Sequence, residues 1–279
     1  MGTSASSPGA PGGVPMVPPW VPSPVPPVDP TAPADQQGAD AGAPPATAMP
    51  AGIAPTARFG GARTSLRDFG ASGSKSDLRT GIKHYVRKGY GGSAVASGRM
   101  ARTARTAGGL YGALSAFASN QSPPGLALDR KLLSTYDAQG VINAVVEAIS
   151  PSDGTLDGEA SREAIADALS EVMDKFSDED VDLLSLTEEQ RAYAIECYVA
   201  EDVYKHIVLD VGNSIRDNAP TIKDAMSRFN DVKSYVQATV SGAFKALKEK
   251  GAVITGKSIA GVASAALKET FEVFEAYIK

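Results

Sequence analysis

The most complete chemical motif in the sequence is a phosphate-loop pattern. Residues 251–258 read Gly-Ala-Val-Ile-Thr-Gly-Lys-Ser and match G-x-x-x-x-G-K-S at every position. Such a loop binds phosphate when it joins a buried strand to a helix, because the turn then directs backbone N–H groups at the anion. Here residues 243–250 continue an amphipathic helical pattern, and only 21 residues follow Ser258. We therefore interpret the segment as a turn between two helices, with nucleotide binding as the alternative.

A second candidate is the acidic run from Asp153 to Glu159, which resembles the start of a calcium loop. The bidentate Glu that ends such a loop would fall on Ala164, which offers no oxygen ligand. Ser150-Pro151-Ser152 precedes the run and a helical pattern follows it. We expect a turn and a helix N-cap here.

The remaining nucleophilic and basic candidates are His84, His206 and Cys197. Neither histidine has a motif neighbour, and Cys197 lies near the apolar face of a predicted helix, as a buried structural thiol does. With one cysteine, the sequence excludes an intramolecular disulfide and a Cys-based metal cluster. A Cys–His pair stays an open alternative. We predict that the chain is not an enzyme and has no catalytic residue, metal site or cofactor.

A basic segment is the clearest binding signal. Residues 58–111 hold 11 Lys or Arg against two Asp, whereas residues 112–279 carry a net charge of -11. Interleaved Phe59, Phe69, Tyr85 and Tyr90 make the segment suited to nucleic acid. The alternative, which we favour, is contact with acidic protein, including the acidic part of this chain. The candidate contacts are Arg58, Arg63, Arg67, Arg79, Lys83, Arg87, Lys88, Arg99, Arg102 and Arg105.

The elements that must position these residues are helices. Apolar residues recur at helical spacing over 160–176, 195–207, 222–247 and 259–278. The second of these stretches opens with Thr187-Glu188-Glu189-Gln190, a capping-box pattern. No segment with alternating strand character rivals them. The sequence therefore predicts an all-α fold, with residues 120–279 as an acidic helical bundle.

The basic segment, residues 58–119, is less regular. Residues 58–70 form a loop-like stretch with two aromatics, and a helical pattern begins at Asp77 and closes at Gly89. The run 93–119 has helical composition but contains four glycines, each of which weakens a helix interior by about 1 kcal/mol relative to Ala. We expect this segment to order through contact with something else.

Residues 1–57 differ from the rest in composition. They hold 15 of the 19 prolines and contain no Leu, Phe or Tyr, so they cannot bury enough apolar surface to offset the entropy of folding. We predict a disordered Pro/Gly/Ala-rich tail in which Trp20 is either incidental or an anchor for a partner groove. No secretory signal pattern is present, and no apolar run approaches the roughly 18 residues of a membrane span. We expect a cytoplasmic protein that does not contact membranes.

The first residues, Met1-Gly2-Thr3-Ser4, are small. Removal of the initiator Met would leave an unhindered Gly2 amine with a pKa of about 7.7–8.0, substantially nucleophilic near neutral pH. The alternative is an ordinary disordered terminus.

The order of short motifs from the start to about residue 157 resembles the QatB family, a component of the four-gene Qat anti-phage defence system. The motifs are Met1-Gly2-Thr3-Ser4, the patch from Gly9 to Gly13, Pro18-Pro19-Trp20, the Pro-rich spacer, the basic segment from Arg58 to Gly70, Tyr85-Val86-Arg87 with Gly89, Gly91 and Gly92, Arg99-Met100, and the run from Ser150 to Asp157.

This resemblance implies three partners: an ATPase, a QueC-like deazaguanine-forming enzyme and a TatD-like nuclease. QueC chemistry activates a carboxylate as an acyl-adenylate, which an amine then attacks. Our hypothesis is that Gly2, with Thr3 and Ser4, is presented to the QueC-like enzyme in place of ammonia, so that the chain is an adaptor and a substrate. The alternative function is nucleic-acid binding through residues 58–111.

Overall fold

The computed structural model describes residues 57–179 and 181–277. The predictions for the tail, including Gly2, Thr3, Ser4 and Trp20, lie outside these described residues. Within them every regular element is a helix, with eleven α-helices in chain order. The all-α prediction is confirmed.

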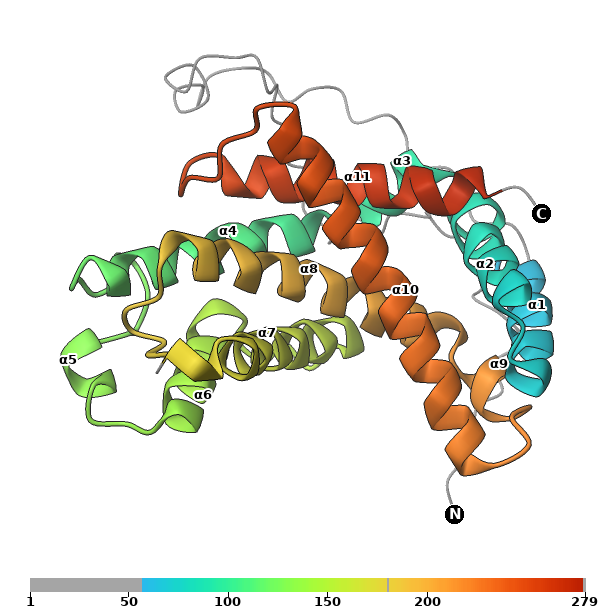
Figure 1. Cartoon of the computed structure of the whole chain (residues 1–279), viewed down its shortest axis with the longest axis horizontal. Coiled ribbons are helices and arrows are strands. Elements are labelled where there is room, and N and C mark those ends of the chain that lie inside the picture. The colour runs from blue at the N-terminus through green and yellow to red at the C-terminus, as the bar shows by residue number, and fades with distance from the viewer. Residues whose placement is uncertain (1–56, 180, 278–279) are drawn as a thin grey trace.

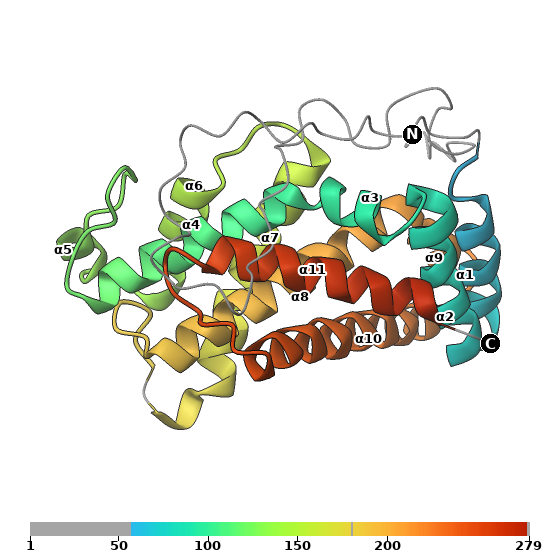
Figure 2. The ribbon, with the colours of Figure 1, turned by 90° about the horizontal axis from the view of Figure 1, so that it is seen from above.

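Five long helices form the body of the molecule (Figure 1). Helix α8 (Glu188–Val211) lies between α4 (Ala101–Ala118) and α7 (Leu156–Lys175), and α10 (Ile222–Glu249) crosses it. Helix α11 (Ile259–Ala276) packs against both α4 and α10, which flank it in Figure 2. Because α8 contacts helices on several sides, 14 of its 24 residues are buried.

Side-chain caps fix where the long helices begin. The predicted capping box is confirmed: Gln190 N–H donates to Thr187 Oγ1, and Thr187 N–H donates to Gln190 Oε1. Thr221 caps α10 in a similar way, since its hydroxyl accepts from Asp224 N–H. A Ser, Thr, Asp or Asn at this position contributes about 1 kcal/mol to helix stability.

Shorter elements close the two ends of the molecule (Figure 1). Helix α6 (Ala138–Ile149) packs on α7, and α9 (Asn213–Arg216) packs on α1 (Gly60–Ser72). These shorter elements are α5 (Arg130–Leu133), α6 (Ala138–Ile149), the 3-10 helix η3 (Ser177–Glu179) and α9 (Asn213–Arg216).

The loop-like prediction for residues 58–70 is wrong from Gly60 onward, because those residues belong to helix α1 (Gly60–Ser72). Ala62, Leu66 and Phe69 recur at helical spacing and are fully buried. Gly70 brings α1 close to α9, since a Cβ built there would lie 2.7 Å from the carbonyl oxygen of Ile215. Tertiary packing on a glycine-lined face thus overrides the low helix propensity of this segment.

Residues 75–118 are helical with two interruptions. Helix α2 (Lys75–His84) continues directly into a π-helix, η2 (Tyr85–Tyr90), and the first interruption follows at Gly91 and Gly92. The second lies at Met100, between α3 (Ser93–Arg99) and α4. The glycines inside α4 do not break it. Gly108 lets α4 approach α11 closely, because a Cβ there would lie 3.1 Å from that of Ala260.

The basic segment and the acidic helices share one hydrophobic core. Phe59, Ile82 and Leu114 belong to the same buried cluster as Ile207, Phe244 and Phe274. The segment that we expected to order through contact packs here against α8, α10 and α11 of its own chain. In the described ranges, no helix is both long enough and apolar enough to cross a membrane.

Candidate functional site

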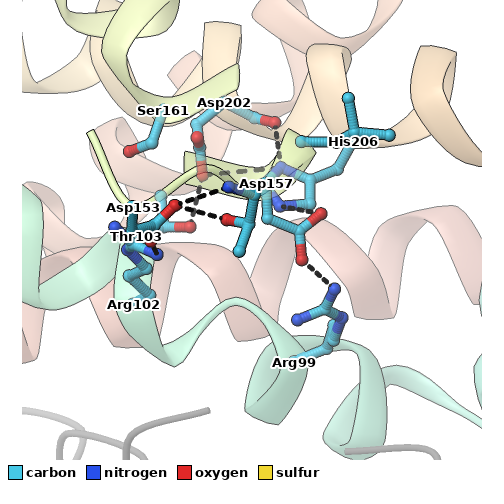
Figure 3. A pocket seen from close by; sticks show the side chains of 10 residues that line it. Arg99, Arg102, Thr103, Asp153, Asp157, Ser161, Asp202 and His206 are labelled. Atoms are coloured by element: carbon cyan, nitrogen blue, oxygen red, sulfur yellow. Dashed lines mark hydrogen bonds and ion pairs between the residues drawn. The ribbon is translucent and has the colours of Figure 1, made fainter. Parts of the chain in front are cut away.

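Three segments that are distant in sequence line a cleft of about 330 Å³ (Figure 3). The end of α3 and the start of α4 supply one wall, the turn before α7 and its first turns supply a second, and α8 supplies the third. The lining residues are Arg99, Arg102, Thr103, Asp153, Thr155, Leu156, Asp157, Ser161, Asp202 and His206.

Two ion pairs join the first wall to the second. Arg99 pairs with Asp157, and Arg102 Nη1 lies 2.6 Å from Asp153 Oδ2. Hydrogen bonds from the Thr155 hydroxyl and from the Arg102 guanidinium hold the pKa of Asp153 well below its usual range. Both pairs connect the predicted basic segment to the acidic part of the same chain.

The turn before α7 explains how Asp153 is held. Its Oδ1 accepts from the backbone N–H and the hydroxyl of Thr155, at 3.0 and 2.6 Å. The Thr155 hydroxyl accepts in turn from Gly158 N–H and caps α7. The predicted turn and N-cap are confirmed.

His206 lies on α8, between two carboxylates. Its Nδ1 is 2.8 Å from the carbonyl oxygen of Asp202, and its Nε2 is 3.7 Å from Asp157 Oδ1. Because a carbonyl oxygen only accepts, Nδ1 carries a proton. In the neutral imidazole Nε2 is then an acceptor.

Asp202 is the most deeply buried acid in the cleft, with 1% of its surface exposed. Its Oδ2 accepts a 2.5 Å hydrogen bond from the Thr103 hydroxyl. Its Oδ1 is buried and has no hydrogen-bond partner among the described residues. A buried acceptor left unpaired costs about 1–3 kcal/mol, and more when it is charged.

The charged side chains of the lining mainly hold the three walls together, since both guanidinium groups are paired with aspartates. The unpaired Oδ1 of Asp202 is closed off from the cleft. Within the described ranges, no group of three His, Cys, Asp or Glu side chains is placed to hold a metal ion.

Other residues of the predicted basic set make contacts outside the cleft. The Arg58 guanidinium lies 4.7 Å from the Phe59 ring centroid, Arg63 Nη2 donates to the Asp210 carbonyl, and Lys83 Nζ donates to the Tyr277 carbonyl. The exposed members of the predicted set are Arg67, Arg79, Arg87, Lys88 and Arg105.

The four aromatic residues that suggested base stacking are buried. Tyr85 and Tyr90 donate their hydroxyls to Asp210 Oδ2 at 2.9 and 2.8 Å, and the ring of Phe59 stacks on that of Tyr85 at 5.3 Å. Burial, together with the Asp210 charge, raises the pKa of both tyrosines. These rings anchor η2 and α1 to the end of α8.

The phosphate-loop pattern forms the connection between α10 and α11, as the helix-to-helix interpretation predicts. Ser258 Oγ donates to the Val253 carbonyl and accepts from Thr255 N–H, so its hydroxyl closes the turn internally. The helix α10, not a strand, precedes the loop.

Cys197 is 5% exposed, and burial raises the pKa of its thiol to about 12. A thiol with that pKa is protonated at neutral pH, which fits the predicted structural role. His84, the other histidine of the sequence, lies on α2, and its Nδ1 is 3.2 Å from the Gly61 carbonyl oxygen.

Asp202 and Thr103 were not among the site residues predicted from the sequence. Asp202 and His206 are four residues apart on one helical face, which is the signal that could have paired them. No sequence signal pointed to Thr103, because its contact with Asp202 depends on how α4 packs against α8.

Comparison with known proteins gives one family. The family described as Qat anti-phage system associated protein QatB matches residues 91–274. No curated protein and no solved structure matches the chain. The matched range includes all the residues that line the cleft.

Proposed function

Because this chain belongs to the QatB family and therefore has a role in the Qat anti-phage system, with other components of that system as its partners, we propose that it acts as a non-catalytic adaptor and substrate. The family match carries this proposal. Under it the chain works in the cytoplasm with a QueC-like enzyme, an ATPase and a TatD-like nuclease.

The substrate role rests on the chemistry of the first residues. Gly2 has no side chain, Thr3 and Ser4 are small, and the first Lys or Arg of the sequence is Arg58. An extended chain spans at most about 3.3–3.6 Å per residue, so the segment before the helical body is long enough to enter a partner's active site. A free glycine amine near its pKa supplies the nucleophile.

The proposed reaction takes place in two steps. The QueC-like enzyme joins a deazaguanine carboxylate to AMP and releases pyrophosphate from ATP. The Gly2 nitrogen then attacks the acyl carbon, an amide bond forms, AMP leaves, and the nitrogen loses its proton to solvent. The helical body takes no part in bond making and serves as the adaptor.

Co-expression with the three partners tests both roles. We expect the chain to co-purify with at least the QueC-like enzyme and its intact mass to rise by one acyl group. Replacing Gly2 with Leu, which keeps Met1 in place, abolishes the mass increase and leaves co-purification unchanged. Co-purification without any mass increase in the wild type would reject the substrate role, and no co-purification would reject the adaptor role.

A second candidate function is nucleic-acid binding through residues 58–111. The exposed Arg67, Arg87 and Lys88 favour it, although the aromatic residues of the segment are buried. Phosphate contacts by these side chains make binding weaken steeply with salt. A gel shift that shows no complex even at low salt would reject this function.

A further inference from the structure

An apolar groove of about 480 Å³ lies where the turn after α9 leads into α10. Ile222 and Met226, one turn apart on α10, are 83% and 64% exposed. Ile222 has the largest exposed fraction among the large apolar side chains that the structure describes. The apolar lining residues are Ala219, Pro220, Ile222, Ala225, Met226 and Phe229. Apolar side chains that are exposed together on a concave surface are typical of a contact site.

The groove offers no unpaired cation among the described residues that line it. Arg216 is the one charged side chain there. Its Nε lies 3.3 Å from Asp217 Oδ1, and its Nη2 donates to Asn213 Oδ1 at 2.7 Å. A strongly charged ligand such as a nucleic-acid strand therefore gains little from this lining, whereas an uncharged apolar segment can cover Ile222 and Met226 without leaving a charge unpaired.

Residues 14–28, which lie outside the described part of the chain, have the matching composition. They consist of Val, Pro, Met, Trp and one Ser, contain no charged side chain, and include Trp20, the only Trp of the sequence. Residues 29–56 differ, since they hold three Asp and only Met49 and Ile53 as large apolar residues. Pro-rich segments suit hydrophobic grooves because they lose less conformational entropy on docking, and a Trp adds a large apolar surface.

The groove adjoins the far end of α1 (Figure 1). At that end Gly70 lies against Ile215 of α9, and Gly73 lies against the Arg228 guanidinium of α10. Because residues 216–229 form the groove, the two contacts flank it in sequence. A segment connected to the start of α1 therefore has only the length of this helix to cross, about 20 Å.

The length of chain before α1 matches this distance. Trp20 precedes Ala57, the first described residue, by 37 residues. A flexible chain of that length spans about 30–36 Å on average, and prolines lengthen it. A tether of matching length gives the segment a millimolar effective concentration at the groove.

We propose that residues 14–28 of this chain dock in the groove, with Trp20 against Ile222 and Met226. The groove is then an interaction surface for the chain's own tail, and the contact does not depend on the modification of Gly2. Residues 2–13 precede the docked segment and span at most about 40 Å, so Gly2 stays within that distance of the groove.

The fluorescence of Trp20 tests the contact in the full chain, because no other Trp contributes. We expect acrylamide to quench Trp20 at least about twofold less in the wild type than in the double variant Ile222→Gln/Met226→Gln, since tethering keeps most chains docked when the contact alone has a Kd below about 1 mM. Both replaced side chains are mostly exposed, so the variant should fold. Val253→Gln is the matched control, because Val253 is 65% exposed and lies outside the groove, and it should behave as the wild type does.

Two outcomes of this measurement would overturn the proposal. Equal quenching in the wild type and in the double variant would show that Trp20 does not lie on Ile222 and Met226. Quenching that increases as the protein is diluted would assign the groove to the tail of a second copy. We expect no dependence on dilution, because a contact within one chain does not depend on concentration.

A synthetic peptide of residues 14–28 separates the groove from the tether. Mixed with the full-length Trp20→Ala variant, the peptide carries the only Trp, and we expect its emission to shift to shorter wavelength and to saturate below millimolar protein concentration. Adding Ile222→Gln and Met226→Gln to that chain should weaken binding at least about tenfold, because two apolar side chains are no longer buried by the peptide. Equal binding to both chains, or no saturable binding to either, would contradict the proposed contact.

Discussion

At the scale of single residues, Asp210 holds both ends of η2 in place through hydrogen bonds. Tyr85 and Tyr90 both donate to its Oδ2, and both tyrosines are buried. Hydrogen bonds to a charged group contribute more to stability than neutral ones. The contact joins η2 to the end of α8 across about 120 residues of sequence.

Tyr85→Phe removes one of these hydroxyls without changing the ring. We expect the free energy of unfolding to fall by about 1–3 kcal/mol, because the Asp210 carboxylate loses a donor at a buried contact. Urea denaturation measures the change. Tyr136→Phe is the control, since Tyr136 is 46% exposed, and an equal effect in both variants would contradict the role of Asp210.

The depressed pKa of Asp153 predicts a pH dependence. Its folded-state pKa lies below the value of about 3.9 expected in the unfolded chain, so its contribution is present above that pH and is lost as pH falls toward the folded value. Asp153→Asn removes the contribution at every pH. We expect the stability difference between wild type and variant to be constant above about pH 5 and to shrink in acid. A difference that grows in acid would contradict the account.

At the scale of elements, periodicity predicted the long helices and failed where glycine lines a contact. The patterns for α7, α10 and α11 are regular because each helix buries one wide face, and that of α8 is recognisable although α8 is buried on several sides. Helix α1 has the same spacing of buried residues, but its glycines resemble a loop in sequence. Gly70 lies against α9 and Gly61 lies against His84 and Lys88, and neither close approach is encoded locally.

Replacing either of two glycines with alanine should change the free energy of unfolding, in opposite directions for the two positions. Gly70→Ala puts a Cβ within 2.7 Å of the Ile215 carbonyl oxygen, so we expect destabilisation by about 1–3 kcal/mol. Gly112→Ala in α4 meets nothing within 4 Å, so the better helix propensity of Ala should stabilise by about 0.5–1 kcal/mol. Thermal melts of both variants give the comparison. Stabilisation by Gly70→Ala would contradict the close packing of α1 on α9.

The cleft was predictable only in part. The sequence identified Arg99 and Arg102 as basic contacts and the run from Asp153 as a turn, and the structure pairs them. Asp202 was not identified, because a single carboxylate in a helix resembles a solvated one until packing shows it buried. Positions that depend on the meeting of three segments carry no local sequence signal.

At the scale of the whole molecule, the basic and acidic parts of the sequence pack against each other within one chain. The sequence divides into a basic segment and an acidic remainder, and the structure packs them around one core with ion pairs at the cleft. A shared core couples its parts energetically, since neither can lose its contacts alone.

A single core predicts one cooperative unfolding transition. Far-ultraviolet circular dichroism and tyrosine fluorescence should give coincident curves in urea, because three of the nine tyrosines lie in residues 58–119, six lie in residues 120–279, and all report on the same event. Two separated transitions would show that residues 58–119 and 120–279 unfold independently.

We propose that Gly2 is the acceptor of a partner's acyl group, and the mass of the N-terminal peptide tests this role most directly. Cleavage before Asp29, the first acidic residue, releases residues 2–28 without the helical body. From protein co-expressed with the QueC-like enzyme, we predict a peptide heavier by one deazaguanine acyl group, with fragment ions that place it on Gly2. An unmodified Gly2, or a retained Met1, in that sample would contradict the account.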